Sequence, residues 1–180
     1  MATGLSGYFA ARNGYYPVAV VNFDLITAEK FSKENYTANK YFQNQFFISG
    51  SDPKTLDSAE AQLEIRRAVL EELIFNSLVY KELNRRFKDE YHSIAENKID
   101  QALKNNSNLQ AAVKELYGLE FSEFKDRVLL PQAYQEILEG RMFLNNENFG
   151  DWLKNAKAKA TVIILSPEFE WNGDGVEIKR

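Results

Sequence analysis

The hydrophobic and polar positions follow their most regular pattern between Glu60 and Phe87, a stretch without Gly or Pro. Two parallel rows of aliphatic residues recur there at every fourth position. These rows are Ile65, Val69 and Leu73, and Leu70, Ile74 and Leu78. The spacing predicts one long helix with a broad apolar stripe. Because burying each such side chain stabilises a fold by roughly 1.5–3 kcal/mol, we expect at least two other elements to pack against it.

Further helices are predicted on both sides of this stretch. They cover about 28–48, 88–104, 109–117, 122–139 and 151–159. Thr27 is suited to cap the first of them and Gly118 to end the third. Pro131 lies inside the fourth, where its missing N–H predicts a kink near residues 127–130. Residues 140–150 are expected to form a loop or a helix-to-helix transition.

Two β-branched runs predict strands, at residues 16–22 and at residues 160–165. Because these runs lie near opposite ends of the chain, the simplest closed arrangement pairs the first strand with the last. The predicted fold class is mainly α, with a small sheet that joins N- and C-terminal strands. We divide the chain into an irregular lead-in or expression remnant at 1–15, one helical domain at 16–166 and a C-terminal tail at 167–180, with a turn at Asn172-Gly173.

Composition excludes several classes of function. A net charge of -4 and a pI near 5.2 argue against a nucleic-acid binder, which needs a basic face. With Cys 0 in the chain, disulfides, thiolate metal sites and cysteine nucleophiles are excluded. No apolar run approaches the length of a membrane span, and the first residues lack the apolar core of a signal peptide. We therefore expect no metal and no cofactor.

Five stretches, taken in order, resemble the N-terminal chaperone domain of SurA- and PrsA-type extracytoplasmic foldases, to which the C-terminal domain of trigger factor is also similar. They are PVAVVNFDLITAEKF, RRAVLEELIFNSLVYKEL, LQAAVKELYGLEFSEFKDRV, RVLLPQAYQEIL and FGDWLKNAKAKATVIIL. Together they cover roughly residues 17–165. Each is a hydrophobic pattern of low specificity, so their order carries the likeness. One departure is Phe23, which replaces the Gly usual after Asn22, so a tight turn there is in doubt.

The resemblance implies an ATP-independent chaperone that binds unfolded or extended segments of exported proteins. Related foldases carry a parvulin-type isomerase module where this chain has only residues 140–150, without paired histidines or a Gly-rich stretch. Peptidyl-prolyl isomerase activity is therefore the least favoured hypothesis, and we expect that the protein is not an enzyme. The resemblance also implies an extracytoplasmic location, in the periplasm or at the cell surface, where such proteins are often tethered to the membrane by an N-terminal segment that this chain would have lost or never had. A cytoplasmic function like that of trigger factor stays open. A homodimer formed by exchange of terminal strands stays open.

An excess of aromatic residues supplies the candidates for a peptide-binding groove, although each one alone also fits a core position. The candidates are Phe46, Phe47, Phe75, Tyr80, Tyr117, Phe121 and Phe143. No catalytic residue is predicted. His92, the single histidine, is interpreted as a polar residue on an exposed helix face, because no nucleophile is predicted beside it. The competing hypothesis is a structural or adaptor domain that docks one specific envelope partner.

Overall fold

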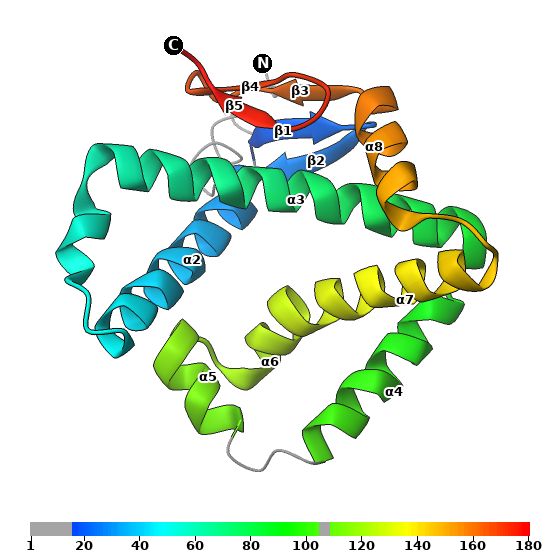
Figure 1. Cartoon of the computed structure of the whole chain (residues 1–180), viewed down its shortest axis with the longest axis horizontal. Helices are drawn as coiled ribbons and strands as arrows, with labels where there is room; N and C mark the ends of the chain where they lie inside the picture. Colours follow the sequence, from blue (N-terminus) through cyan, green and yellow to red (C-terminus); the bar gives the residue numbers. More distant parts are fainter. Residues whose placement is uncertain (1–15, 105–108) are drawn as a thin grey trace, which may run out of the picture.

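The computed structural model of the protein describes residues 16–104 and 109–180. A long helix, α3 (Ala59–Phe87), runs across the molecule and separates two layers (Figure 1). Small β-sheets and α8 lie along one side of α3, and the remaining helices lie along the other. The fold is mainly α with a small antiparallel sheet of terminal strands, as predicted.

The other elements follow in chain order. The helices are α2 (Ala28–Ile48), α4 (Glu90–Lys104), α5 (Leu109–Tyr117), α6 (Phe121–Phe124), α7 (Leu130–Leu144) and α8 (Phe149–Lys159), with a short 3-10 helix η1 (Pro53–Asp57) and a π-helical turn η2 (Lys125–Leu129). The strands are β1 (Pro17–Val21), β2 (Asp24–Thr27), β3 (Val162–Ile164), β4 (Phe169–Trp171) and β5 (Val176–Ile178). The predicted lead-in at 1–15 and the loop at 105–108 lie outside the described residues.

The two helices with the clearest sequence patterns form where they were predicted. The hydroxyl of Thr27 caps α2 by accepting a hydrogen bond from the backbone N–H of Lys30 over 3.2 Å. Ser58 caps α3 in the same way through the N–H of Ala61. All six residues of the two aliphatic rows on α3 are buried. The long helix is therefore the spine of the core, as expected.

The core on α3 divides into a sheet side and a helix side. Toward the sheets, α3 residues pack with Val21, Ile26 and Phe169. Farther along, its C-terminal half packs with α4 and α7 around Tyr91 and Leu138. A third, smaller cluster holds α5 against α6. Within the described ranges, none of the helices combines the length and apolar character needed to cross a membrane.

The terminal strands pair as predicted, and a strand that the sequence pattern missed joins them. Strand β1 lies between β2 and β3, antiparallel to both, so the order is β2-β1-β3. Residues 24–27 lie between the predicted strand at 16–22 and the predicted helix at 28–48, and β2 is too short to show an alternating pattern. Val20 of β1 lies opposite both Leu25 and Ile163. These three side chains therefore share the outer face of the sheet.

The turn between β1 and β2 is tight despite its phenylalanine. Asn22 and Phe23 both adopt the left-handed backbone region, with φ of 49° and 78°, as two-residue hairpin turns require. Asn22 is held by Thr161, whose N–H donates to Asn22 Oδ1 over 3.0 Å and whose carbonyl accepts from the Asn22 N–H over 2.9 Å. The doubt that the sequence raised about this turn is thus removed, and Phe23 is 93% exposed at its tip.

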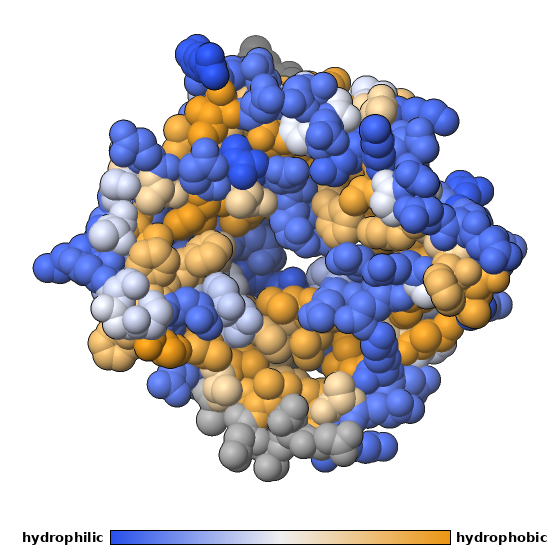
Figure 2. Space-filling model, in the orientation of Figure 1, coloured by the Kyte–Doolittle hydropathy of each residue, from blue (hydrophilic) through white to orange (hydrophobic). Residues whose placement is uncertain are grey.

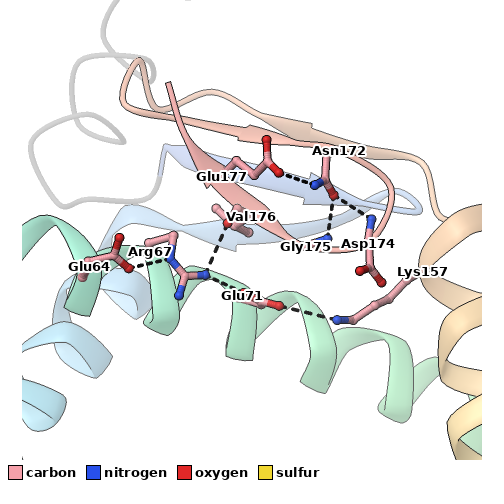
Figure 3. Close-up of polar contacts among 9 residues, drawn as sticks. All are labelled: Glu64, Arg67, Glu71, Lys157, Asn172, Asp174, Gly175, Val176 and Glu177. Carbon is pink, nitrogen blue, oxygen red and sulfur yellow. Dashed lines mark hydrogen bonds and ion pairs between the residues drawn. The ribbon is translucent and has the colours of Figure 1, made fainter. Parts of the chain in front are cut away.

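The segment at 167–180, expected to be a tail, forms the β4–β5 hairpin and packs on α3. Asn172 Oδ1 accepts hydrogen bonds of 2.8 Å from the N–H groups of Asp174 and Gly175, which builds the predicted turn (Figure 3). Arg67 of α3 donates to the carbonyl of Val176 over 3.3 Å. Both Phe169 and Val176 are buried. The hairpin is therefore part of the same folded unit.

The kink predicted at Pro131 takes the form of the π-helical turn η2, which links α6 to α7 without a break in the helix. A π turn is one of the usual ways in which a helix accommodates a local irregularity. The transition between helices predicted at 140–150 is shorter than expected, because α7 continues through Gly140 to Leu144 and α8 begins at Phe149. Met142 is fully buried, and its burial outweighs the low helix propensity of Gly140.

Candidate functional site

Two cavities of about 460 and 680 Å³ adjoin beneath α3. They share the lining residues Lys30, Leu73, Asn76, Asp126 and Pro131. We call the combined cavity the central groove. Figure 2 shows the molecule hollowed at this place, between α2, α3 and α7.

Six elements supply the walls of the central groove. Helix α3 forms its roof, α2 one side, and η2 with the start of α7 the other. Strand β2 contributes Leu25 at one end, where α4 contributes His92. Aliphatic residues such as Val69, Leu73 and Leu130 line its interior next to charged and amide side chains. The groove is thus an open, mixed surface instead of a closed apolar pocket.

Arg127 fixes the distance between the two side walls. Its Nε donates to Glu34 Oε1 over 2.9 Å, and its Nη2 donates to Thr37 Oγ1 and to the carbonyl of Lys33, each over 2.6 Å. Both partners of the ion pair are largely shielded from solvent. Arg127 protrudes from the π turn, so the same irregularity that accommodates Pro131 also joins η2 to α2.

One end of the central groove is lined by a cluster of aromatic rings from α3, α4 and α7. Tyr80, His92 and Tyr134 line the cavity, and we call them the aromatic wall. His92 Nδ1 lies 2.8 Å from the hydroxyl of Tyr134. Tyr91 is fully buried behind the wall, 5.1 Å from the Tyr134 ring, and donates its hydroxyl to Asn84 Oδ1 over 2.8 Å. The wall is therefore rigid and amphipathic.

The environment favours the neutral form of the Tyr91 and Tyr134 phenols. Burial, followed by the nearby Tyr80, raises the pKa of Tyr134. Burial likewise raises the pKa of Tyr91, with a hydrogen bond to Tyr80 as the next cause. Tyr91 and Tyr134 therefore stay protonated above the usual range of a phenol and keep both donor and acceptor capacity.

Glu72 brings a carboxyl group to the roof of the groove. Desolvation raises its pKa, against a hydrogen bond from Asn76 that lowers it. The neighbouring charge of Glu71 raises it further. Although other atoms of the residue remain exposed, its carboxyl is less well solvated than a free side chain.

The arrangement presents aromatic rings together with hydrogen-bonding groups. His92 Nδ1 is engaged by the phenol of Tyr134, whose pKa is raised. Within residues 16–104 and 109–180, no group of three or more His, Asp or Glu residues could hold a metal ion. An aromatic surface with hydroxyl groups gives large contact area and adaptable hydrogen bonds, as at protein-binding surfaces.

The structure does not gather the seven aromatic candidates into one groove. Tyr80 lines the central groove, whereas Phe75 lines a separate depression beside Glu71 and Lys157. Phe46 packs against the sheet-side core, and Tyr117 and Phe121 pack in the α5–α6 cluster. Phe47 and Phe143 are exposed by 77% and 78%. They lie at the C-terminal ends of α2 and α7 and do not line the groove.

Several groove residues escaped the sequence interpretation. His92 is half-buried in the aromatic wall, which corrects its interpretation as a residue on an exposed face. Tyr134 and Leu25 were not singled out at all. These residues come from α4, α7 and β2, which are far apart in the chain, so no local pattern links them. The nearest signal was the proximity of Tyr91 and His92 in one helical turn.

Comparison of the chain with protein-family models, with curated proteins and with solved structures gives no match.

Proposed function

We propose that this protein is an ATP-independent chaperone domain that binds extended segments of unfolded, exported polypeptides in the central groove. The observation that carries the proposal is the form of the groove. Its two adjoining cavities make an open trough with an aromatic wall at one end and aliphatic residues along its length. An unfolded client needs contiguous apolar area with adaptable polar groups more than one specific pocket.

The exposed aromatic residues support the same proposal. Phe23, Phe47 and Phe143 lie at the tips of the β1–β2 hairpin, α2 and α7, where they contact little of their own chain. Such residues add apolar contact points around a central trough and suit clients of varied sequence. The likeness of the ordered motifs to extracytoplasmic foldases is the basis for proposing exported proteins as clients. It is also the basis for a location outside the cytoplasmic membrane.

A second function, an adaptor that docks one specific partner, is favoured by the outer face of the terminal sheet. Leu25, Val20 and Ile163 form an apolar row across three strands, and Leu165 lies two residues beyond Ile163. Leu25, Ile163 and Leu165 are each more than half exposed. Aliphatic sheet faces of this kind usually pack against another layer of structure.

Light scattering of a chemically unfolded client diluted into buffer tests the first function. We expect the protein at a few-fold excess to suppress aggregation, and Tyr80→Ala to weaken suppression because it removes part of the aromatic wall. Tyr36→Ala is the matched control, since Tyr36 is exposed on α2 and does not line the groove. Absence of suppression by the unmodified protein would overturn the proposal. A single saturable partner in a pull-down, lost with Ile163→Ser, would then support the adaptor.

A further inference from the structure

A smaller cavity of about 290 Å³ lies where α3, α8 and the β1–β2 turn meet. It is distinct from the central groove, although Lys81 lines both. Figure 1 shows α8 beside the end of β1 and above the C-terminal half of α3. Nothing in the proposed chaperone function uses this cavity.

The floor of the cavity is apolar. Leu78 is buried, Trp152 and Ala156 of α8 are half-buried, and all three line the cavity. The Trp152 ring is held by Phe149, with ring centroids 5.3 Å apart. A volume near 300 Å³ lies at the lower end of ligand pockets, so the cavity suits one side chain or a small organic group.

The rim is rich in positive charge. Lys81, Arg85 and Lys159 line the cavity from α3 and α8. The only carboxylate in its lining is Glu82, which is already paired with Arg85 and with Arg86 at 2.7 and 2.5 Å. Among the described residues Lys159 makes no ion pair. The rim therefore has an excess of positive charge.

The rim also has more hydrogen-bond donors than acceptors. Lys81 Nζ donates to the carbonyl of Asn22 over 3.1 Å, which leaves two of its three N–H groups. The Asn22 Oδ1 atom accepts from the N–H of Thr161, so its amide N–H₂ group remains as a donor. The Glu82 carboxylate accepts hydrogen bonds from Nε and Nη2 of Arg85, so Nη1 of Arg85 remains as a donor. Asn155 Nδ2 donates to the backbone carbonyl of Asp151, so the Asn155 Oδ1 atom remains as an acceptor.

We propose that this cavity binds a carboxylate attached to an apolar group, with the apolar group on Trp152 and the carboxylate between Lys81 and Lys159. A ligand with this chemistry is either the C-terminal residue of a polypeptide or a small aryl or alkyl carboxylic acid. Charge-assisted hydrogen bonds hold the carboxylate, and the apolar floor selects against small inorganic anions.

Calorimetric titration of the full chain with hydrocinnamate and with its uncharged amide tests the proposal. We expect the acid to bind at least about tenfold more tightly than the amide, since hydrogen bonds to charged groups contribute about 1.5–3 kcal/mol. Binding of the acid, and not of the amide, weakens as salt increases. Equal binding of the two compounds, or no binding of either, would overturn the proposal.

Two variants and a second ligand complete the test. The double variant Lys81→Gln/Lys159→Gln is expected to lose about tenfold in affinity, whereas Lys154→Gln, on the same helix but outside the cavity, leaves it unchanged. Unchanged affinity in the double variant would overturn the assignment. An acetylated peptide that ends in Phe, compared as acid and amide, distinguishes the source: tighter binding than hydrocinnamate indicates a chain end, and equal or weaker binding indicates a small acid.

Discussion

Arg127 and Glu34 are 93 positions apart in the chain and form a bidentate ion pair with distances of 2.9 and 3.2 Å. The pair joins the π turn before α7 to the N-terminal half of α2, and both residues line the central groove. Both side chains are mostly buried, at 16% and 20% exposure. The same guanidinium also donates to Thr37, a buried polar residue. One side chain thus sets the width of the groove.

Replacing Arg127 with Ala is expected to lower the free energy of unfolding by about 2 kcal/mol, because it leaves a mostly buried Glu34 carboxylate without its partner. It should also weaken client binding, since the α2 and α7 walls lose their link. Urea denaturation measures the first effect and aggregation suppression the second. Lys33→Ala is the control: it breaks an exposed pair with Glu29 and should cost less than about 0.5 kcal/mol. An Arg127→Ala variant as stable as the Lys33→Ala variant would contradict this role.

Phe23 adopts φ of 78°, where an L-residue with a Cβ is strained, and it is 93% exposed. Phe23→Gly should therefore raise the free energy of unfolding by about 1 kcal/mol, because glycine adopts this conformation without a steric penalty. Phe23→Ala is the matched control, since alanine keeps the Cβ and its strain. Thermal unfolding of both variants checks the prediction. Equal midpoints for the Gly and Ala variants would show that the turn is not strained at this position.

The long elements could be predicted from the sequence because their signals are local. The aliphatic rows of α3 and the Thr27 cap of α2 depend on residues within one or two helical turns. The pairing of β1 with β3 could be predicted because the sequence showed two clear strands, one near each end of the chain. The predicted helix ended at residue 139, whereas α7 ends at Leu144. Gly140 is a weak helix former, and the burial of Met142 depends on contacts from other elements, which a local pattern does not show.

The candidate site could be predicted far less well, because it is made by tertiary contacts. Tyr80 and Tyr134 both line the groove, with ring centroids 6.2 Å apart, yet they belong to different helices. Aromatic content alone could not separate Tyr80 from Phe46, which packs in the core. Arg127 was noted only as part of a kink, and its partner Glu34 lies in another helix.

The β4–β5 hairpin should prove essential to stability, although the sequence suggested a tail. Phe169 is fully buried in the cluster that includes α3. Phe169→Ala is expected to lower the free energy of unfolding by about 3–5 kcal/mol, the cost usual for a buried Phe. Glu170→Ala, whose side chain is exposed on the next residue of β4, should change it by less than about 0.5 kcal/mol. Similar denaturation midpoints for the two variants would mean that the hairpin detaches without cost.

Ionisation of Glu72 should lower the free energy of unfolding as pH rises. Desolvation raises its pKa in the folded state above the value in the unfolded chain. Between these two pKa values the folded state binds more protons than the unfolded state, so the free energy of unfolding falls as pH rises through that range. Below the unfolded pKa the carboxyl is protonated in both states and this penalty disappears.

Glu72→Gln removes this titration while it keeps the size and hydrogen bonding of the side chain. We expect the variant to be more stable than the parent at pH 7, and the two to converge near pH 4. Urea denaturation at a series of pH values measures the difference. Glu139→Gln, at an exposed residue of α7 that makes no ion pair within the described ranges, is the control for a general effect of charge. A Glu72→Gln variant that is less stable than the parent at pH 7 would mean that the charged carboxylate is favoured in the fold.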